Sequence, residues 1–471
     1  MLFLGRNDEI ERLAALATSE EGGLAVLHGR RRIGKTRLLL EWANRHDGLY
    51  TVADQSAPEI QRRYLAQSIA SRFPGFADVT YPDWSSLFDR LGTEAQSQEW
   101  RGPLILDELP YLVATSPEVP SVLQRFVDHH ARQSRLVLAV AGSSQRMMQG
   151  IVLSANAPLY GRARVLLKLG PLEPGWVLRV WGETARDAAE FHAAWGGVPR
   201  HWELAVAEEG SVPQQVEHLV LDPLGPLHSE PDRLLVEEIP TSREFRPLLD
   251  AIGSGAHRVS EIAGRLGRPA TSLARPLDRL QEMDLIRREV PFGEDERKSK
   301  RSVYRMNDPF VRLWFRVVAP HRAALASGTS TSRRRHLEQS WKGLLGSSWE
   351  DLTCDRLPHV DGPLSKLGAW EPGRRWWQGA APEWDVVSRS DSGDLLLGEA
   401  KWSSRPVSKS ALERMVRALE SRDPPSLGRA NETAEAQRVL FVPELAKGVR
   451  KRVRDVLVVT AAELIGKVGR R

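Results

Sequence analysis

Residues 24–40 read LAVLHGRRRIGKTRLLL: an apolar run, a basic loop bounded by glycines, and a second apolar run. From Gly29 to Thr36 the loop follows the pattern G-x-x-x-x-G-K-T, which binds phosphate when it joins a strand to a helix. Glycine allows the backbone amides to approach the phosphate oxygens, and Lys35 places a positive charge on the β and γ phosphates. Thr36 offers its hydroxyl to Mg²⁺. The pattern therefore predicts an ATP-binding P-loop built on Gly29, Gly34, Lys35 and Thr36.

A shorter apolar run, LILDE at residues 104–108, ends in two adjacent carboxylates. At the end of a buried strand this pair suits a P-loop site, where Asp107 holds Mg²⁺ through water and Glu108 polarises the attacking water. The following apolar run ends in AGSS, residues 141–144, so Ser143 would contact the γ-phosphate. An ordinary strand-to-loop turn accounts for the same serines, and that alternative stays open. The expected cofactors are ATP and Mg²⁺.

Apolar runs alternate with stretches of helical periodicity in the first third of the chain, which predicts a parallel α/β sheet. The runs cover residues 24–28, 50–53, 104–106 and 136–141. After Pro171 they stop, and residues 171–225 read as short helices that form a lid. Three prolines between residues 222 and 231 interrupt helices and strands alike and mark a boundary. The polar run 326–335 marks another and predicts a linker or exposed loop.

Five ordered motifs resemble those of the archaeal-type prokaryotic AAA ATPases, which are kin to the STAND and origin-recognition ATPases. They are FLGRNDE at residues 3–9, HGRRRIGKT at 28–36, AGSS at 141–144, PLYGR at 158–162 and WGGVP at 195–199. In that family the Gly-Arg element near the N-terminus lies by the adenine, so the resemblance implies that Arg6 binds the cofactor. It favours Arg162 over Arg164 as an arginine finger that stabilises transition-state charge. A finger acting in trans would require a homo-oligomer.

Between residues 246 and 306 the pattern changes to three helices followed by two strands around a charged tip. This is the order of a winged helix-turn-helix, in which the third helix enters a DNA groove and the wing contacts phosphate. The DNA-facing candidates are the basic residues of these two elements: Arg275, Arg279, Lys298, Lys300 and Arg301. Pro276 disagrees with an unbroken third helix because it lacks a backbone donor. A winged helix used only for protein packing is the alternative.

In the C-terminal part, two apolar runs each carry an acid: PEWDVV at residues 382–387 and LLLGEAKW at 395–402. On an extended strand Glu399 and Lys401 face the same side, because side chains repeat every second residue. Asp385 can approach from the neighbouring strand. Two carboxylates can bind Mg²⁺ while Lys401 stabilises the attacking water or the developing phosphorane charge.

This arrangement resembles the PD-(D/E)XK nuclease core, with Glu350 on the preceding helix as an additional acid. Asp351 beside it competes for that assignment. Acids near a lysine are often surface salt bridges, so the alternatives are an active nuclease, an inactive nuclease-like domain and a plain ion pair. The resemblance to the ATPase family supports the winged helix, because NDPFVRLWFR at residues 307–316 resembles the join that follows it in that family. The family's usual C-terminal domain in turn favours the nuclease-like fold.

Composition limits the remaining classes of protein. Cys354 is the only cysteine, which excludes an intramolecular disulfide and a zinc site of the all-thiolate kind. No apolar stretch is long enough to span a membrane, so we expect a cytoplasmic protein without a membrane partner. The net charge is +5, and basic runs such as 298–301, 333–335 and 447–454 favour a nucleic-acid partner, DNA before RNA. Solvated loops are the alternative.

The expected architecture is α/β: a P-loop AAA core at residues 1–170, a helical lid at 171–225, a winged helix-turn-helix at 226–325 and an α/β restriction-endonuclease-like domain at 336–471. We expect an ATP-hydrolysing protein that couples its nucleotide state to DNA binding and to Mg²⁺-dependent nucleic-acid cleavage. The alternative is a STAND-like signalling switch whose C-terminal domains only bind DNA or protein partners.

Overall fold

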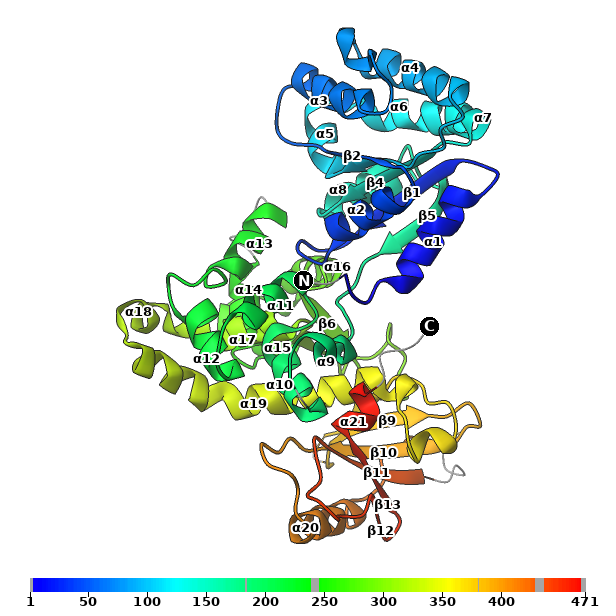
Figure 1. The fold of residues 1–471 in the computed structure, drawn as a ribbon. Helices are drawn as coiled ribbons and strands as arrows, with labels where there is room; N and C mark the ends of the chain where they lie inside the picture. The colour runs from blue at the N-terminus through cyan, green and yellow to red at the C-terminus, as the bar shows by residue number, and fades with distance from the viewer. Residues whose placement is uncertain (1–2, 183, 239–244, 380, 428–435, 467–471) are drawn as a thin grey trace. The chain divides into compact units, whose positions relative to one another are not determined.

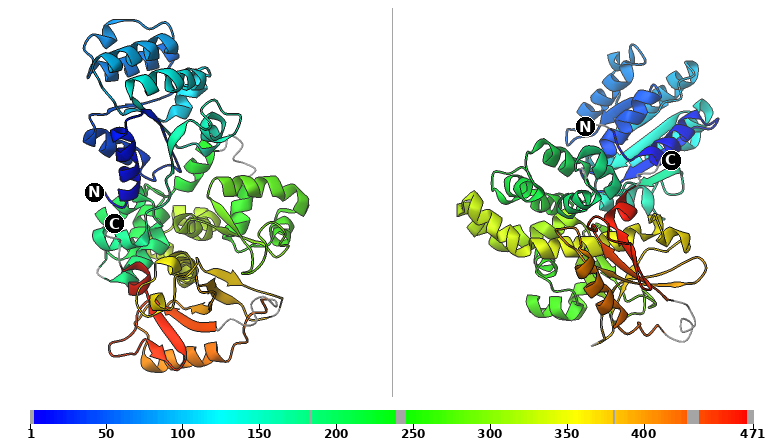
Figure 2. Two further views of the ribbon diagram at one scale, coloured as in Figure 1. Left: turned by 90° about the vertical axis from the view of Figure 1, so that its right-hand side faces the viewer. Right: turned by 60° about the horizontal axis from the view of Figure 1, so that its bottom comes forward.

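The computed structural model describes residues 3–182, 184–238, 245–379, 381–427 and 436–466. It divides into two compact units. The first comprises the residues up to Leu172 together with Val198–Arg200, and the second comprises Glu173–Gly197 and the residues from His201 onward. Most of the segment expected to be a lid therefore belongs to the second unit. Figures 1 and 2 show the elements of each unit.

The first unit contains a five-stranded sheet in the order β2-β3-β4-β1-β5, and every pair of neighbouring strands is parallel. The strands are β1 (Gly23–His28), β2 (Leu49–Val52), β3 (Leu104–Asp107), β4 (Val137–Gly142) and β5 (Ala163–Lys168). The structure confirms the predicted parallel α/β sheet. The prediction lacked β5, an edge strand in which exposed and partly buried residues alternate, so that it has no continuous apolar run.

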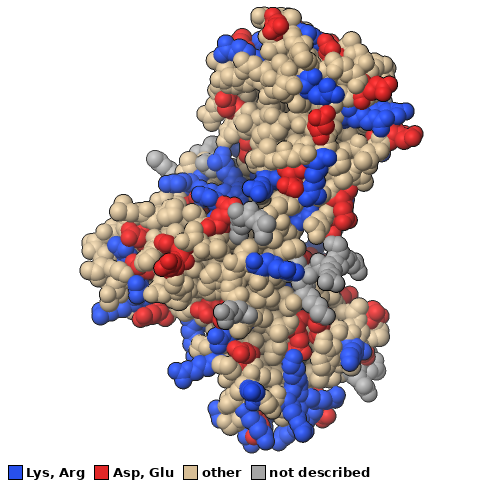
Figure 3. Space-filling view, viewed as in Figure 1, with Lys and Arg blue, Asp and Glu red and all other residues tan. Residues whose placement is uncertain are grey.

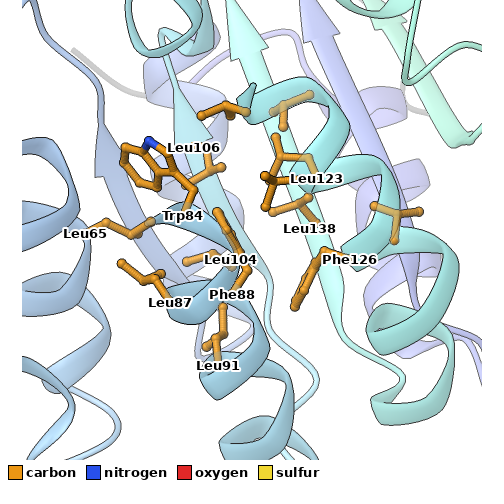
Figure 4. Close-up of a cluster of buried hydrophobic side chains, with 14 of the residues drawn as sticks. Leu65, Trp84, Leu87, Phe88, Leu91, Leu104, Leu106, Leu123, Phe126 and Leu138 are labelled. Carbon is orange, nitrogen blue, oxygen red and sulfur yellow. The ribbon is translucent and has the colours of Figure 1, made fainter. Parts of the chain in front are cut away.

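Helices cover both faces of this sheet. Because side chains alternate along a strand, Leu24 and Val26 of β1 pack on one face, while Ala25 and Leu27 pack on the other. The first face lies under the helices with large aromatic residues, including Trp84, as Figure 4 shows. The helices of the unit are α1 (Asn7–Thr18), α2 (Lys35–Arg45), α3 (Pro58–Ala70), α4 (Trp84–Ser97), α5 (Leu109–Thr115), α6 (Val119–Phe126), α7 (Arg132–Ser134) and α8 (Gln145–Met148).

The second unit begins with short helices, as the sequence predicted for residues 171–225. They are α9 (Val177–Val180), α10 (Ala185–Trp195), α11 (Pro199–Ala207), α12 (Val212–Val216) and α13 (Glu230–Glu238). Tryptophans 195 and 202 are fully buried there, and the Trp202 indole N–H donates to the Gly196 carbonyl oxygen (2.8 Å). The buried Trp202 side chain thus holds the Gly-Gly turn that was predicted from WGGVP.

Three helices and an antiparallel hairpin follow at the predicted positions. They are α14 (Arg246–Gly253), α15 (Val259–Leu266), α16 (Ala274–Glu282), β6 (Ile286–Glu289) and β7 (Val303–Met306). Pro276 is the third residue of α16, where the backbone N–H has no partner within the helix, so the expected conflict does not arise. Ser260, a residue type that often caps helices, is the second residue of α15 and does not cap it. Instead the Glu261 side chain accepts the backbone N–H of His257 (2.9 Å) and of Arg258 (3.1 Å).

The polar run 326–335 is not the linker or loop that its composition predicted. A 27-residue helix, α19 (Ser330–Arg356), begins inside it, after α17 (Pro309–Leu313) and α18 (Ala319–Ser327). Thr329 caps the helix by accepting the N–H of Ser332 (3.3 Å), and Arg333 pairs with the buried Glu217 (3.1 Å). Serine and threonine therefore serve as a helix start here, a use that composition does not distinguish from a flexible loop.

The C-terminal part folds around a six-stranded mixed sheet in the order β12-β13-β11-β10-β9-β8. The strands are β8 (Arg374–Trp376), β9 (Trp384–Arg389), β10 (Leu395–Ala400), β11 (Ala436–Val442), β12 (Arg452–Val453) and β13 (Val456–Thr460). α19 lies on one face and α20 (Lys409–Glu420) packs on the other, as Figure 1 shows, and the short α21 (Ala461–Ile465) follows β13. β9 and β10 are antiparallel neighbours, so the two predicted acids lie on adjacent strands.

Candidate functional site

The predicted P-loop connects β1 to α2 and holds the end of the Lys35 side chain. Gly29 has a φ of 151°, and a Cβ there would lie 2.6 Å from the carbonyl oxygen of Leu169, so the loop requires glycine. Gly34, with a φ of 97°, directly precedes α2. Lys35 is 5% exposed, and its Nζ donates to the carbonyl oxygens of Gly29 (2.9 Å) and Arg30 (3.1 Å). The ammonium group thus lies at the loop whose amides would hold phosphate.

Asp107 lies beside α2 and accepts three hydrogen bonds. Its Oδ2 accepts from Thr36 Oγ1 (2.7 Å) and from the Tyr50 hydroxyl (2.9 Å), and its Oδ1 accepts from the backbone N–H of Glu108 (2.9 Å). Because Thr36 donates its hydrogen to Asp107, the lone pairs of its oxygen remain for a cation. This donor set fits Mg²⁺, which prefers carboxylate, hydroxyl and water oxygens. Sequence reasoning missed Tyr50 because a single tyrosine in a strand belongs to no motif.

Glu108 stands between β3 and α5 in the left-handed conformation, with a φ of 53°. For a residue other than glycine this conformation costs on the order of 1 kcal/mol. The Glu108 Oε2 accepts hydrogen bonds from the hydroxyl of Ser143 (2.8 Å) and from its backbone N–H (3.3 Å). Ser143 and Glu108, predicted to act on the γ-phosphate and on water, are therefore bonded to each other. Ser144 instead caps α8 by accepting the N–H of Met147 (3.5 Å).

The two arginines implied by the resemblance are both bonded within the first unit. Arg6 is 6% exposed and donates to the carbonyl oxygens of Ile33 (3.0 Å) and Gly170 (2.7 Å), which ties the P-loop to the segment after β5. Arg162 donates from Nε to both carboxylate oxygens of Asp128 (3.0 and 3.1 Å). The adenine contact of Arg6 and the arginine-finger role of Arg162 remain predictions.

The predicted DNA-facing residues lie on α16 and on the hairpin of β6 and β7. Three of them are exposed and form no ion pair within the described residues: Arg275, Lys298 and Lys300. The other two are engaged. Arg279 pairs with Glu282 (2.7 Å), whereas Arg301 pairs with Glu294 and donates to the carbonyl oxygen of Trp377 (3.2 Å).

The hairpin tip contacts the edge of the C-terminal sheet. The Phe292 N–H donates to the carbonyl oxygen of Arg375 on β8 (2.9 Å), and the Phe292 side chain packs against the apolar cluster of that sheet. Arg375 also pairs with Glu289 of β6 (3.0 Å) and with Asp351 of α19 (2.6 Å). Burial alone would raise the pKa of Asp351, but Arg287 and its neighbouring arginines hold that pKa well below its usual range. Asp351 is thus the centre of a structural ion-pair cluster.

Asp385 and Glu399 lie at the adjoining ends of β9 and β10. The Asp385 Oδ2 accepts the N–H of Ala400 (3.0 Å). Burial, and after it the charge of Glu399, raise the pKa of Asp385 to about 7. Burial would likewise raise the pKa of Glu399, but hydrogen bonds from Arg422 and Lys401 outweigh it and lower that pKa. The structure thus brings the three predicted residues together and adds Arg422, which the sequence gave no reason to select.

The structure separates the two candidate acids of α19. Asp351 is occupied by the arginine cluster, whereas the charge of Glu350 is among the causes that raise the pKa of Asp385. Glu350 accepts a hydrogen bond from Arg375 (3.1 Å). Of the two α19 acids, it is the one whose charge contributes to the raised pKa of Asp385. Within the described ranges, no group of three or more His, Cys, Asp or Glu side chains is arranged to hold a metal ion.

The parallel sheet, the P-loop and the pair Asp107 and Glu108 define the nucleotide site of a P-loop ATPase. Residues 3–218 match the family model of an ATPase domain found predominantly in Archaea. Residues 314–415 match a second model, that of archaeal and bacterial proteins of unknown function. The chain is therefore similar to an archaeal-type ATPase domain over residues 3–218 and to a domain of that second kind over residues 314–415. In the part of the chain that the structure describes, no helix is long and apolar enough to cross a membrane.

Three proteins that are similar to this chain are each at most 27% identical to it. An uncharacterized protein of Methanocaldococcus jannaschii, MJECL04, is 27% identical over 411 residues, which are 85% of this chain and 88% of the relative. The solved Walker-type ATPase PABY2304 of Pyrococcus abyssi is 20% identical with a TM-score of 0.48, over 67% of this chain and 96% of that one. The Aeropyrum pernix ORC2 protein is 14% identical with a TM-score of 0.42, over 72% and 94%.

Proposed function

We propose that this protein is an ATPase that couples its nucleotide state to nucleic-acid binding and to metal-dependent cleavage by its C-terminal domain. The observation that carries the proposal is the convergence of Asp385, Glu399 and Lys401 on neighbouring strands of a chain that also contains a P-loop site. The order α19, β8, β9, β10, α20, β11 agrees with the resemblance to the PD-(D/E)XK core. The predicted domain ranges 226–325 and 336–471 would supply the binding and cutting functions.

In the nucleotide site, Lys35 would exchange the loop carbonyls for phosphate oxygens. Thr36 and Asp107 would hold Mg²⁺, which would neutralise the negative charge that develops on the phosphate. Ser143 occupies the Oε2 atom of Glu108, which leaves Oε1 to accept a hydrogen bond from the attacking water and polarise it. The Ser143 bond would thereby hold the Glu108 carboxylate in place for that role.

Nucleic acid would bind first through its phosphates, because exposed basic side chains release counterions when they contact a polyanion. Lys298 and Lys300 on the hairpin are free to do so. On the face drawn in Figure 3, further Lys and Arg side chains gather at the lower end, where Figure 1 draws β12, β13 and α20. The exposed Arg450 and Arg452 belong to the basic run 447–454 of that region. These groups support a nucleic-acid partner.

For cleavage, a water molecule would attack the phosphorus of a backbone phosphate while the bond to the leaving oxygen breaks. Asp385 and Glu399 would hold a divalent cation, which lowers the charge on the phosphate oxygens. Glu399 is now paired with Lys401 and Arg422, so metal binding requires that at least one of these cations moves away. Lys401 would then be available to stabilise the attacking water or the developing charge.

A signalling switch remains the second candidate function, and one observation favours it. The Glu399 carboxylate is already neutralised by two cations, and the described residues offer no ready three-ligand metal group. In that case ATP would control assembly, and the C-terminal domains would only bind DNA or protein partners.

The experiment that separates the two functions is cleavage of supercoiled plasmid and single-stranded DNA in Mg²⁺ or Mn²⁺, each with and without ATP. We expect the wild-type protein to cut and Glu399→Ala to lose at least about a hundredfold in rate, because a metal-binding carboxylate is removed. Glu371→Ala, which removes an exposed acid ahead of β8, is the matched control and should cut normally.

Two results would count against cleavage. If Glu399→Ala cuts as fast as the wild type, the activity belongs to another site or a contaminant. If the wild type does not cut under any of these conditions while it binds DNA, the C-terminal domain is a binding platform and the switch is the better description.

A further inference from the structure

We propose that Tyr50 is a positioning residue of the nucleotide site, whose hydroxyl fixes Asp107 for the Mg²⁺ that accompanies ATP. The inference rests on binding of ATP with Mg²⁺ at the P-loop. No sequence motif includes Tyr50, which lies on β2, 57 positions before Asp107.

Strand register explains how the two side chains meet. β2 and β3 are parallel, with Tyr50 opposite Ile105 and Val52 opposite Asp107. Side chains two positions apart on a strand share a face, so Tyr50, Ile105 and Asp107 all lie on the α2 side of the sheet, where Tyr50 packs against the apolar cluster of that face. Asp107 is thus the diagonal neighbour of Tyr50, at a spacing that an aromatic side chain can reach.

Two hydroxyls from different elements converge on one carboxylate oxygen. Tyr50 from β2 and Thr36 from α2 both donate to Oδ2 of Asp107, at 2.9 and 2.7 Å, and the 1%-exposed carboxylate is further fixed by the N–H of Glu108 on Oδ1. With donors on both oxygens the Asp107 side chain cannot rotate without breaking a hydrogen bond. Its remaining lone pairs therefore point in set directions, toward which metal-bound water can donate.

The Tyr50 hydroxyl donates to Asp107 as a neutral group, because a phenol is protonated throughout the neutral pH range. A neutral donor fixes Asp107 without cancelling its charge, whereas a lysine in the same place would compete with Mg²⁺. The chemistry of the side chain thus suits the support of a cation site.

The test is Tyr50→Phe, which keeps the ring in the apolar cluster and removes the hydroxyl alone. ATP binding is measured by calorimetry over a series of Mg²⁺ concentrations and in EDTA. We expect the Mg²⁺ concentration at half-saturation to rise about tenfold, because loss of a group that orients a metal-binding side chain typically weakens metal affinity by that order. ATP affinity in EDTA should stay unchanged, and the metal-free variant should still unfold in one cooperative transition, at a slightly lower urea concentration because one buried hydrogen bond is lost. Tyr64→Phe, on α3 and 44% exposed, is the matched control.

The outcomes separate this inference from the assignment of the nucleotide site. If the wild type binds ATP with no dependence on Mg²⁺, the assignment of the site itself is wrong. If the wild type shows the dependence and Tyr50→Phe shows the same curve, Tyr50 has no positioning role. If Tyr50→Phe loses ATP affinity equally in EDTA and in Mg²⁺, the hydroxyl supports the fold of the site rather than the metal, and the proposal is overturned.

Discussion

Two pairs of acids have different partners. Asp107 and Glu108 are consecutive residues at the end of β3, whereas Asp385 and Glu399 lie on the neighbouring strands β9 and β10. Asp107 and Glu108 are held by hydroxyls and backbone amides, which are neutral donors. Glu399 is held by Lys401 and Arg422, which are cations, and Asp385 beside it has a pKa raised to about 7. The first pair keeps its negative charge for a ligand, whereas the second pair has already lost much of it.

The partner of a charged group decides what that group can still bind. A neutral hydrogen bond orients a carboxylate and leaves its charge uncompensated, so a divalent cation gains the full attraction. An ion pair satisfies the carboxylate, and a metal must first displace the resident cation. The P-loop pair therefore keeps its charge uncompensated, whereas a metal at the C-terminal pair would first have to displace Lys401 or Arg422 from Glu399. Three experiments test this comparison.

The largest effect is expected in the first pair. Glu108→Gln keeps the hydrogen bond with Ser143 but removes the negative charge that polarises water, so ATP hydrolysis should fall by about a hundredfold or more. ATP affinity should change little, because Glu108 does not hold phosphate. Turnover and binding are measured separately, with the exposed Glu118→Gln on the end of α6 as control. Normal turnover in Glu108→Gln would falsify the assignment of Glu108 as the water-polarising acid.

The second pair is tested by pH. Because the folded-state pKa of Asp385 lies above the unfolded value of about 4, the folded protein binds this proton more tightly, and stability falls as pH rises from about 4 to 7. Asp385→Asn removes this loss. In EDTA at pH 8 the variant should be more stable than the wild type by on the order of 2 to 4 kcal/mol, and at pH 4 it should not be.

Urea unfolding at the two pH values measures this difference, and the exposed Asp455→Asn between β12 and β13 serves as control. An advantage of Asp385→Asn that is equal at pH 4 and pH 8 would show that the carboxyl does not titrate in this range. The comparison between the two acid pairs would then lose its electrostatic basis.

The sequence predicted those residues that belong to local patterns. Gly29 to Thr36 and the pair Asp107 and Glu108 lie at strand ends within short motifs, so their geometry follows from chain connectivity. The proximity of Lys401 to Glu399 was predictable for the same reason, because the two residues lie two positions apart at the end of β10. The confirmed part of the fold is the parallel sheet, whose central strands are continuous apolar runs.

The rest depends on contacts between distant positions. Tyr50 reaches Asp107 across the register of β2 and β3, and Arg422 reaches Glu399 from beyond α20. Neither contact leaves a periodic or local signal in the sequence. The helix start at Ser330 was missed for a related reason: its stability comes partly from the ion pair between Arg333 and Glu217, 116 positions apart.

The smallest effect is expected for the basic side chains of the hairpin, which also differ in whether they have an oppositely charged partner within the chain. Lys298 and Lys300 are exposed without an ion pair in the described chain, whereas Arg301 on the same hairpin is paired with Glu294 and bonded to the Trp377 carbonyl oxygen. If the free charges contact DNA phosphates, the double variant Lys298→Ala, Lys300→Ala should bind DNA a few-fold more weakly. The slope of log affinity against log salt concentration should also become shallower, by roughly 0.9 for each of about two lost phosphate contacts.

Arg301→Ala should alter the salt slope by less than one contact, because its charge is already engaged within the chain. Fluorescence anisotropy with labelled duplex DNA over a range of salt concentrations measures all three slopes. Equal losses for the lysine pair and for Arg301 would mean that the ion pair between Arg301 and Glu294 breaks when DNA binds. An ion-pair partner within the chain would then not decide which basic side chains contact DNA. No loss in any variant would place the DNA contact elsewhere, with the basic run 447–454 as the next surface to neutralise.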